Sequence, residues 1–174
     1  LIIQPFYIPS SSMENTLLIG DRLFVTKYSY GYSRHSFPFS PKIMKSRLFY
    51  KEPKRGDVIV FKTPSDNRTD YIKRLIGIGG DEIQFINGDL YINKKKITKK
   101  FIRKDYVFCG SENIQVNIYR EKINKNSEYE IAYFKKNSLS DTDPYIVPKK
   151  HFFFLGDNRD CSKDSRFLMS VGYV

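Results

Sequence analysis

Serine and lysine are the residue types in this chain that could together carry out nucleophilic acyl transfer without a histidine. Ser12 ends a run of three serines where an extended segment turns, which can expose its hydroxyl for attack. Backbone N–H groups at such a turn can converge on an oxyanion, and Ser10 could add a hydroxyl donor. Neither His35 nor His151 stands in a recognisable nucleophile or base context or in a metal-ligand pattern. The alternative for the serines alone is an ordinary serine-rich turn.

Lys73 is the candidate general base. It lies in a predicted strand whose alternation places it on one face with Tyr71 and Leu75, while Arg74 points to the other face. A lysine must be neutral to accept a proton, and burial beside apolar groups lowers its pKa from about 10.4. The alternative is a lysine at a strand edge that reaches water.

A third cluster, residues 156–166, combines small polar residues with alternating charges. Ser162 could orient a lysine amine, and either Asp164 or Arg166 could take part in pairing with Arg74. The alternative is a surface loop of ion pairs, which would contribute little energetically.

Four blocks in order resemble the bacterial type I signal peptidases, the serine-lysine leader peptidases. A lysine at the base position is typical of the bacterial branch. Asn15 stands where the family commonly has proline. The blocks are residues 9–17, 20–31, 55–81 (with Tyr71-Ile72-Lys73-Arg74) and 156–166 (with Gly156-Asp157-Asn158-Arg159-Asp160).

The resemblance implies a serine endopeptidase that cuts after small residues, in an A-x-A pattern, to remove signal peptides from exported preproteins. It implies Ser12 as nucleophile and Lys73 as base, without metal or cofactor. The implied supporting residues are Ser10 as oxyanion donor, Ser162 bonded to Lys73, and Asp164 paired with Arg166 and Arg74. The implied lining of the shallow substrate pockets is Phe6, Ile8, Met13, Leu17, Tyr71 and Ile72.

The elements that must position these residues are mostly strands. Val58–Phe61, 71–78 and 152–155 read as buried strands, and Asn87-Gly88 between apolar alternations predicts a hairpin. We expect weak strands at best over 94–128 and a long loop or flap over 28–55. The predicted fold is mainly β, a signal-peptidase-like protease core (1–81 and 149–174) with an inserted β-rich lobe (82–148).

Composition limits the location and the partners. The 174 residues carry a net charge of +11, which suits anionic lipid headgroups. The apolar runs are shorter than the roughly 18 residues of a membrane span. We interpret the chain as a fragment that lacks its C-terminal end and an N-terminal membrane anchor, with the catalytic domain on the outer face of the cell membrane.

Two alternatives stay open at this point. A self-cleaving serine-lysine repressor domain would use the same chemistry on its own chain. A basic, aromatic β-barrel that binds single-stranded nucleic acid would explain the charge but not the serine and lysine blocks; we expect no nucleic-acid partner. Cys109 and Cys161 fit either two free thiols or one disulfide.

Overall fold

A computed structural model describes residues 3–26, 29–30, 51–134 and 139–174. Its regular elements are strands, apart from one three-residue 3-10 helix, so the predicted mainly β class is confirmed. Most of the predicted 28–55 loop lies outside the described residues. The elements are β1 (Ile3–Tyr7), η1 (Ser11–Met13), β2 (Arg22–Thr26), β3 (Val58–Lys62), β4 (Asp70–Ile78), β5 (Glu82–Ile86), β6 (Asp89–Ile92), β7 (Lys95–Lys96), β8 (Thr98–Cys109), β9 (Glu112–Asn124), β10 (Ser127–Tyr133), β11 (Tyr145–Ile146) and β12 (Phe152–Leu155).

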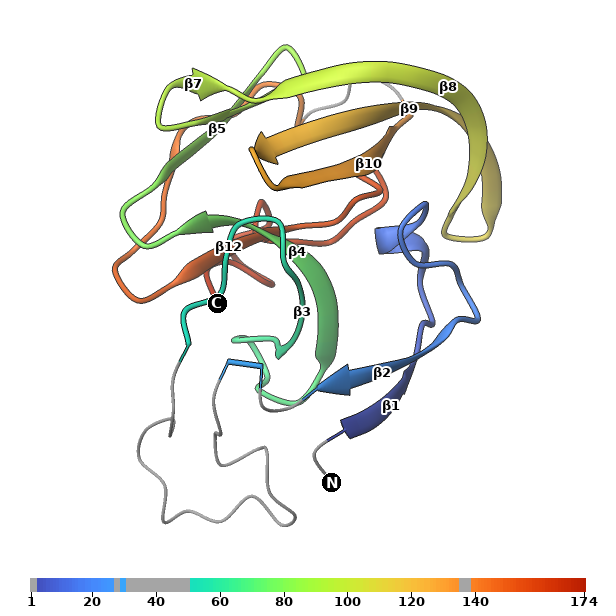
Figure 1. Ribbon diagram of the computed structural model, residues 1–174, viewed down its shortest axis with the longest axis horizontal. Coiled ribbons are helices and arrows are strands. Elements are labelled where there is room, and N and C mark those ends of the chain that lie inside the picture. The colour runs from blue at the N-terminus through green and yellow to red at the C-terminus, as the bar shows by residue number, and fades with distance from the viewer. Residues whose placement is uncertain (1–2, 27–28, 31–50, 135–138) are drawn as a thin grey trace.

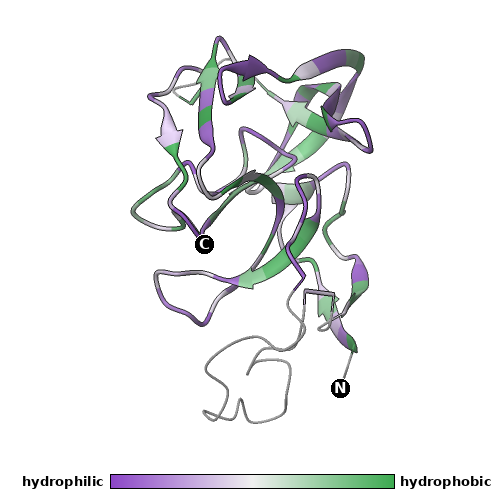
Figure 2. Ribbon diagram, turned by 60° about the vertical axis from the view of Figure 1, so that its left-hand side comes forward, coloured by the Kyte–Doolittle hydropathy of each residue, from purple (hydrophilic) through white to green (hydrophobic). Residues whose placement is uncertain are grey.

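The sheet β12-β4-β3 carries the candidate base. Strand β4 is its middle strand and is antiparallel to both neighbours, with Lys73 opposite Ile59 of β3 and Arg74 opposite Leu155 of β12. Residues 73–77 of β4 are all buried, and Figure 2 shows hydrophobic colouring along the curve of the strand. A lysine in the centre of such a sheet is removed from water.

The candidate nucleophile follows the two-stranded sheet β1-β2. The pairing runs from Ile3 opposite Thr26 to Tyr7 opposite Arg22, and the Ile8 N–H then donates to the Asp21 carbonyl. Beyond Pro9 the chain leaves the ladder and enters η1. In Figure 1, η1 lies between the β1-β2 sheet and the end of the β8-β9 hairpin.

The predicted Asn-Gly hairpin is confirmed. Strands β5 and β6 pair around Asn87 and Gly88, whose φ angles of 51° and 74° suit the two-residue turns of hairpins. The four-stranded sheet β11-β5-β6-β7 contains this hairpin.

The expectation of weak strands over 94–128 is wrong. Strands β8 and β9 are the longest in the described structure, and β10 completes their three-stranded sheet. A register shift between Phe101 and Arg103 interrupts the period-two alternation of β8, which hides the strand signal in the sequence. One face of the sheet is nevertheless buried, with Val107, Val116 and Ile118 in a small cluster of their own.

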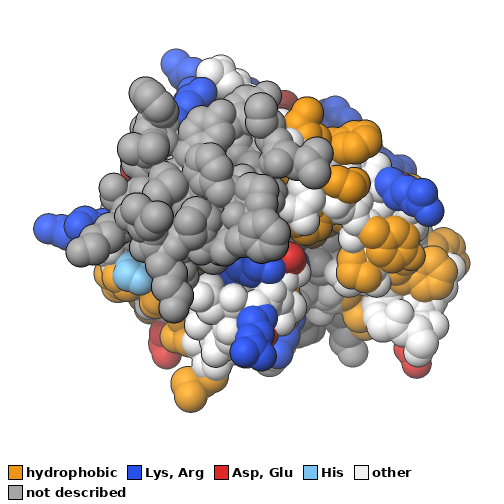
Figure 3. Space-filling model, turned by 90° about the horizontal axis from the view of Figure 1, so that it is seen from below, with side chains coloured by type: hydrophobic (Ala, Val, Ile, Leu, Met, Phe, Trp, Pro, Cys, Tyr) orange, Lys and Arg blue, Asp and Glu red, His pale blue; other side chains and the backbone are white. Residues whose placement is uncertain are grey.

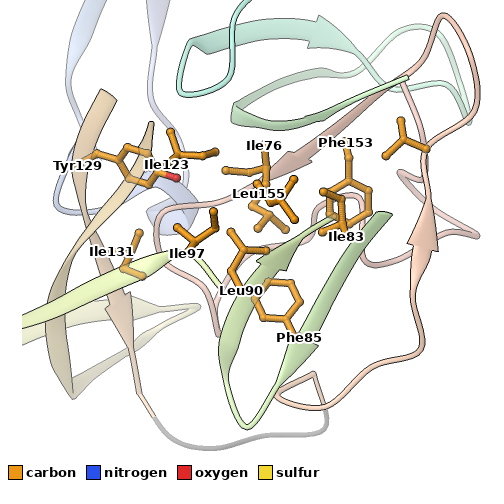
Figure 4. Packing of buried hydrophobic residues seen from close by; sticks show 12 residues of the cluster. Ile76, Ile83, Phe85, Leu90, Ile97, Ile123, Tyr129, Ile131, Phe153 and Leu155 are labelled. Carbon is orange, nitrogen blue, oxygen red and sulfur yellow. The ribbon is translucent and has the colours of Figure 1, made fainter. Parts of the chain in front are cut away.

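The largest core crosses the predicted boundary between core and lobe. Figure 4 shows Ile76, Phe153 and Leu155 packed with Ile83, Leu90, Ile131 and their neighbours. Residues 82–148 therefore share buried apolar surface with β4 and β12. The division into a catalytic core and an inserted lobe stays a prediction.

Candidate active site

Two of the predicted residues from distant parts of the sequence meet at the surface of the β12-β4-β3 sheet. The Lys73 amine donates a hydrogen bond of 2.5 Å to Ser12 Oγ and a longer one of 3.1 Å to the carbonyl of Ile72. Both residues are buried, Ser12 at 6% and Lys73 at 4% exposure. The central strand and the short helix thus bring a hydroxyl and an amine into direct contact.

The environment of Lys73 lowers its basicity. Burial disfavours the ammonium form and brings the pKa of Lys73 from 10.5 to about 8, while the charges of Asp164 and Asp157 oppose this shift. Its Nζ also lies 5.2 Å from the centre of the Tyr71 ring. A lysine with this pKa is partly neutral near physiological pH and can accept a proton.

Ser10 lies at the entrance to this contact. Its Oγ is 3.4 Å from Ser12 Oγ, and Ser10 is exposed whereas Ser12 is buried. The Ser10 backbone is extended and the 3-10 turn begins at Ser11. A hydroxyl so placed can reach a negatively charged oxygen that forms next to Ser12.

The predicted pairing of Asp164 with Arg166 is present, and the predicted pairing of Asp164 with Arg74 is wrong. Asp164 accepts hydrogen bonds from the Arg166 guanidinium at 2.8 Å and from the Gly156 N–H at 3.0 Å. Although burial alone would raise the pKa of Asp164, these contacts outweigh it and the pKa is lowered. Arg74 instead forms a bidentate pair with Asp157, at 2.6 and 2.8 Å, because β4 and β12 are adjacent and Asp157 is the second residue after β12.

Ser162 lies in the same loop, but the predicted hydrogen bond between Ser162 and Lys73 is not present. The amine of Lys73 is occupied by Ser12 and Ile72, and the buried hydroxyl of Ser162 lies instead against Gly156. A Cβ on Gly156 would come within 2.2 Å of Ser162 Oγ and 2.5 Å of the Ser12 carbonyl oxygen. Only glycine allows the loop to approach Ser12 this closely.

Several contacts that hold the site in place were not predicted from the sequence. Arg159 is fully buried and donates to the Glu121 carboxylate from β9, which also accepts from the Tyr129 hydroxyl at 2.7 Å. Asn158 donates to the carbonyls of Ser11 and Ser12, through its side chain and its backbone N–H respectively. Asn158 and Arg159 lie in the quoted 156–160 block, but their partners are distant in sequence.

The two cysteines form a disulfide. Cys109 at the end of β8 is bonded to Cys161, next to Ser162, with 5.3 Å between the Cα atoms. The spacing of the two cysteines left this pairing open, because proximity depends on the unpredicted length of the β8-β9 hairpin.

The residues expected to line substrate pockets differ in exposure. Phe6, Leu17, Tyr71 and Ile72 are half-buried, while Ile8 and Met13 are buried at 2% and 0% exposure. Phe6 lies on β1 and Ile8 directly after it, Met13 lies in η1 and Leu17 in the turn that follows, and Tyr71 and Ile72 lie at the start of β4. These segments carry or flank Ser12 and Lys73.

In the described part of the chain, no three His, Cys, Asp or Glu side chains gather in a way that could hold a metal ion. The described residues also contain no helix of the length and hydrophobicity needed to cross a bilayer.

Comparison with known proteins places these residues in a family context. The family model described as "Signal peptidase, peptidase S26" matches residues 1–174. The chain is 42% identical to signal peptidase I of Rickettsia prowazekii (strain Madrid E) over 184 positions and 42% identical to that of Rickettsia conorii over 185, covering 100% of this chain and 67% of each relative. A signal peptidase I structure from Enterococcus faecalis V583 aligns with a TM-score of 0.39 and 30% identity, over 71% of this chain and 90% of that chain.

Proposed function

This chain belongs to the signal peptidase family, peptidase S26, and we propose that Ser12 and Lys73 are the nucleophile and the general base with which it cleaves. The family consists of serine endopeptidases that remove signal peptides from preproteins, and the chain is an enzyme of this kind. The single observation that supports the assignment of the dyad is the 2.5 Å hydrogen bond between Lys73 Nζ and Ser12 Oγ.

The geometry supports a two-step acyl transfer. With Lys73 neutral, Ser12 Oγ attacks the scissile carbonyl carbon while its proton passes to Lys73 Nζ. The oxyanion is stabilised by the Ser12 N–H and the Ser10 hydroxyl. Lys73 then protonates the leaving amine as the peptide C–N bond breaks, which leaves an ester on Ser12. A water molecule, deprotonated by the same lysine, hydrolyses the ester and restores the serine.

Ser162 and the ion pairs are proposed to support the base. Asp157 and Asp164 hold Arg74 and Arg166, and these pairs fix the 156–166 loop beside Lys73. Ser162 lies on this loop, and a rotation of its side chain toward Lys73 would orient the amine when the substrate is bound.

We propose that the enzyme selects substrates with small side chains directly before the cleavage site. The substrate would lie across the half-buried side chains of Phe6, Leu17, Tyr71 and Ile72, with Ile8 and Met13 forming the floor. A floor that is already closely packed leaves room for alanine and excludes larger residues, which is the basis for the A-x-A preference.

Trans-cleavage of a separate preprotein tests this function. A preprotein with an A-x-A cleavage site is incubated with the detergent-solubilised wild type, Ser12→Ala, Lys73→Ala and the double variant. Each single variant is expected to lose nearly all activity and the double variant to lose little more, because the two residues act as one unit. As a matched control, Lys62→Ala on the neighbouring strand β3 should retain activity, since its side chain is 38% exposed. Near-wild-type cleavage by either single dyad variant would contradict the assignment, and cleavage only within the chain itself would favour the self-cleaving alternative.

We further propose that the enzyme acts at the outer face of the cell membrane, on an anchor outside this chain. Exposed apolar side chains lie on β2, the turn before it and the end of β8, including Phe24 at 78%, Leu18 at 53% and Tyr106 at 60% exposure. In the view of Figure 3, hydrophobic side chains gather on one side of this surface. The disulfide fits the oxidising side of a membrane.

Vesicle binding tests the lipid contact. The protein should sediment with vesicles that contain anionic phospholipid, and Phe24→Ser should weaken this binding without changing the cleavage of a short soluble peptide. The net charge of +11 predicts that added salt or purely zwitterionic vesicles also weaken it. Equal binding of wild type and Phe24→Ser would contradict this surface.

A further inference from the structure

The turn that carries Ser12 has little structure of its own. Helix η1 consists of three residues, its N-cap makes no side-chain hydrogen bond, and Asn15 just after it has a φ of 79°. A single 3-10 turn is not stable alone. The position of Ser12 Oγ relative to Lys73 must therefore be set by contacts from other parts of the fold.

One set of contacts comes from the end of the β8-β9 hairpin. The Phe108 N–H donates to Glu14 Oε2 at 2.7 Å, directly after η1, and the Phe108 carbonyl accepts from Asn158 Nδ2 at 3.2 Å. The same Asn158 amide group donates to the Ser11 carbonyl at 3.2 Å. Both polar groups of the Phe108 backbone are thus joined to the nucleophile turn, one directly and one through Asn158.

A covalent bond fixes the hairpin end in this place. The residue after Phe108 is Cys109, and its disulfide to Cys161 ties the hairpin to the loop that contains Asn158. The Cys161 N–H also donates to the Asn158 carbonyl at 3.3 Å. Glu14, Phe108, Cys109, Asn158 and Cys161 therefore form a chain of contacts that η1 closes into a ring, because Asn158 bonds to Ser11 at the start of η1 and Glu14 follows its end. We call these five residues the hairpin clamp.

We propose that the hairpin clamp positions Ser12 for catalysis and that Glu14 is the positioning residue through which the hairpin acts on the turn. The proposal rests on Ser12 and Lys73 being the dyad. Glu14 is 8% exposed, and its carboxylate accepts the hydrogen bond from the Phe108 N–H. Neither Glu14 nor the disulfide touches the reacting atoms. Because an error of about 1 Å in a reacting group can cost on the order of 100-fold in rate, the clamp affects turnover.

The main test compares Glu14→Ala with Glu14→Gln in steady-state cleavage of a preprotein. Glu14→Ala removes the acceptor of the Phe108 N–H and should lower kcat by about tenfold or more, with KM changed by no more than about twofold. Glu14→Gln keeps a carbonyl oxygen at the same position and should retain most of kcat. The pH dependence gives a second readout, because a displaced turn exposes Lys73 to water and moves the rise in activity to higher pH.

Removal of the disulfide is a second test, which still applies if Glu14→Ala does not fold. The variant Cys109→Ser with Cys161→Ser should lower kcat and shift the pH profile in the same direction. If Glu14→Ala folds, it can be combined with the two cysteine substitutions. The combined variant should lose less activity than the product of the two separate losses, since both changes act on the hairpin clamp.

A matched control separates positioning from stability. Ile118→Val removes a methylene from the separate cluster of the β8-β10 sheet, so it should lower the Tm while leaving kcat and the pH profile unchanged. The clamp is overturned if the disulfide-free variant, or Glu14→Ala, behaves like Ile118→Val. Activity in a parallel Ser12→Ala variant would instead overturn the dyad, so the two failures are distinguishable.

Discussion

Replacement of Lys73 by methionine should abolish cleavage and, at neutral pH, make the protein more stable. Methionine is unbranched and of similar length, so it can occupy the space of the lysine stem without placing a charge in the sheet. In the wild type the Lys73 amine is buried next to Ser12, and this burial lowers the pKa of Lys73 from 10.5 to about 8. A lowered lysine pKa means that folding works against protonation of this group.

The size and sign of the effect follow from the two pKa values. The shift of roughly 2.5 units corresponds to about 3 kcal/mol of unfolding free energy at about 1.36 kcal/mol per unit. Below pH 8 the amine is protonated in both states, and the full cost is present. Between pH 8 and 10.5 the unfolded state binds more protons than the folded state, so wild-type stability rises with pH and the cost is gone above that window. Loss of the hydrogen bond to Ser12 offsets about 1 kcal/mol, which leaves a gain of about 2 kcal/mol for Lys73→Met at pH 7.

Urea unfolding of both proteins at pH 7 and near pH 10.5 measures this difference. Other titrating groups are common to both proteins and cancel when the two free energies of unfolding are subtracted. Lys62→Met, which removes a lysine with 38% side-chain exposure from the adjacent strand, is the control and should show no comparable gain at pH 7. A Lys73→Met variant that is less stable than wild type at pH 7, or whose advantage is the same at both pH values, would refute the reasoning.

Four further predictions concern turnover, specificity and the nucleophile turn. In wild type, kcat/KM should rise about tenfold per pH unit up to a pKa near 8 and then level off; a rise that disappears when His151 is replaced would rule out the lysine base. Ser10→Ala should lower kcat by about 10²–10³-fold with little change in KM, and a change in KM alone would place Ser10 in substrate binding. Ile72→Ala should lower the ratio of kcat/KM for a substrate with Ala before the cut to kcat/KM for one with Val there. An unchanged ratio would mean that Ile72 does not border the pocket. Asn15→Pro should lower the Tm and the activity because proline fixes φ near −65° where this turn has 79°, whereas Asn15→Gly should retain both; an unchanged Tm in the proline variant would exclude the left-handed turn.

The candidate residues Ser12 and Lys73, which the structure brings into contact, and the central sheet could be singled out from the sequence because their signals are local. Short apolar runs mark β3, β4 and β12, and Asn87-Gly88 marks a hairpin. The partner residues that hold the site in place could not be predicted, because they are distant in the sequence. Glu121 lies 38 residues from Arg159 and belongs to β9, a strand that was expected to be weak at best, so no local pattern connects the two. The choice of Asp157 over Asp164 as the partner of Arg74 depends on strand register.

The arrangement of buried charges is consistent with the proposed role of Lys73 as a base. The described structure holds three buried ion pairs: Arg74 with Asp157, Arg159 with Glu121, and Arg166 with Asp164. The charges of Asp157 and Asp164 act on Lys73. Each carboxylate is thereby committed to a guanidinium, and among the described residues none lies within ion-pair distance of the lysine amine. A carboxylate paired directly with Lys73 would stabilise its ammonium form, raise its pKa and remove the base. If Lys73 is the base, as proposed, Arg74 and Arg166 support it without touching the substrate, because they pair with Asp157 and Asp164 and leave burial as the dominant influence on the pKa of Lys73.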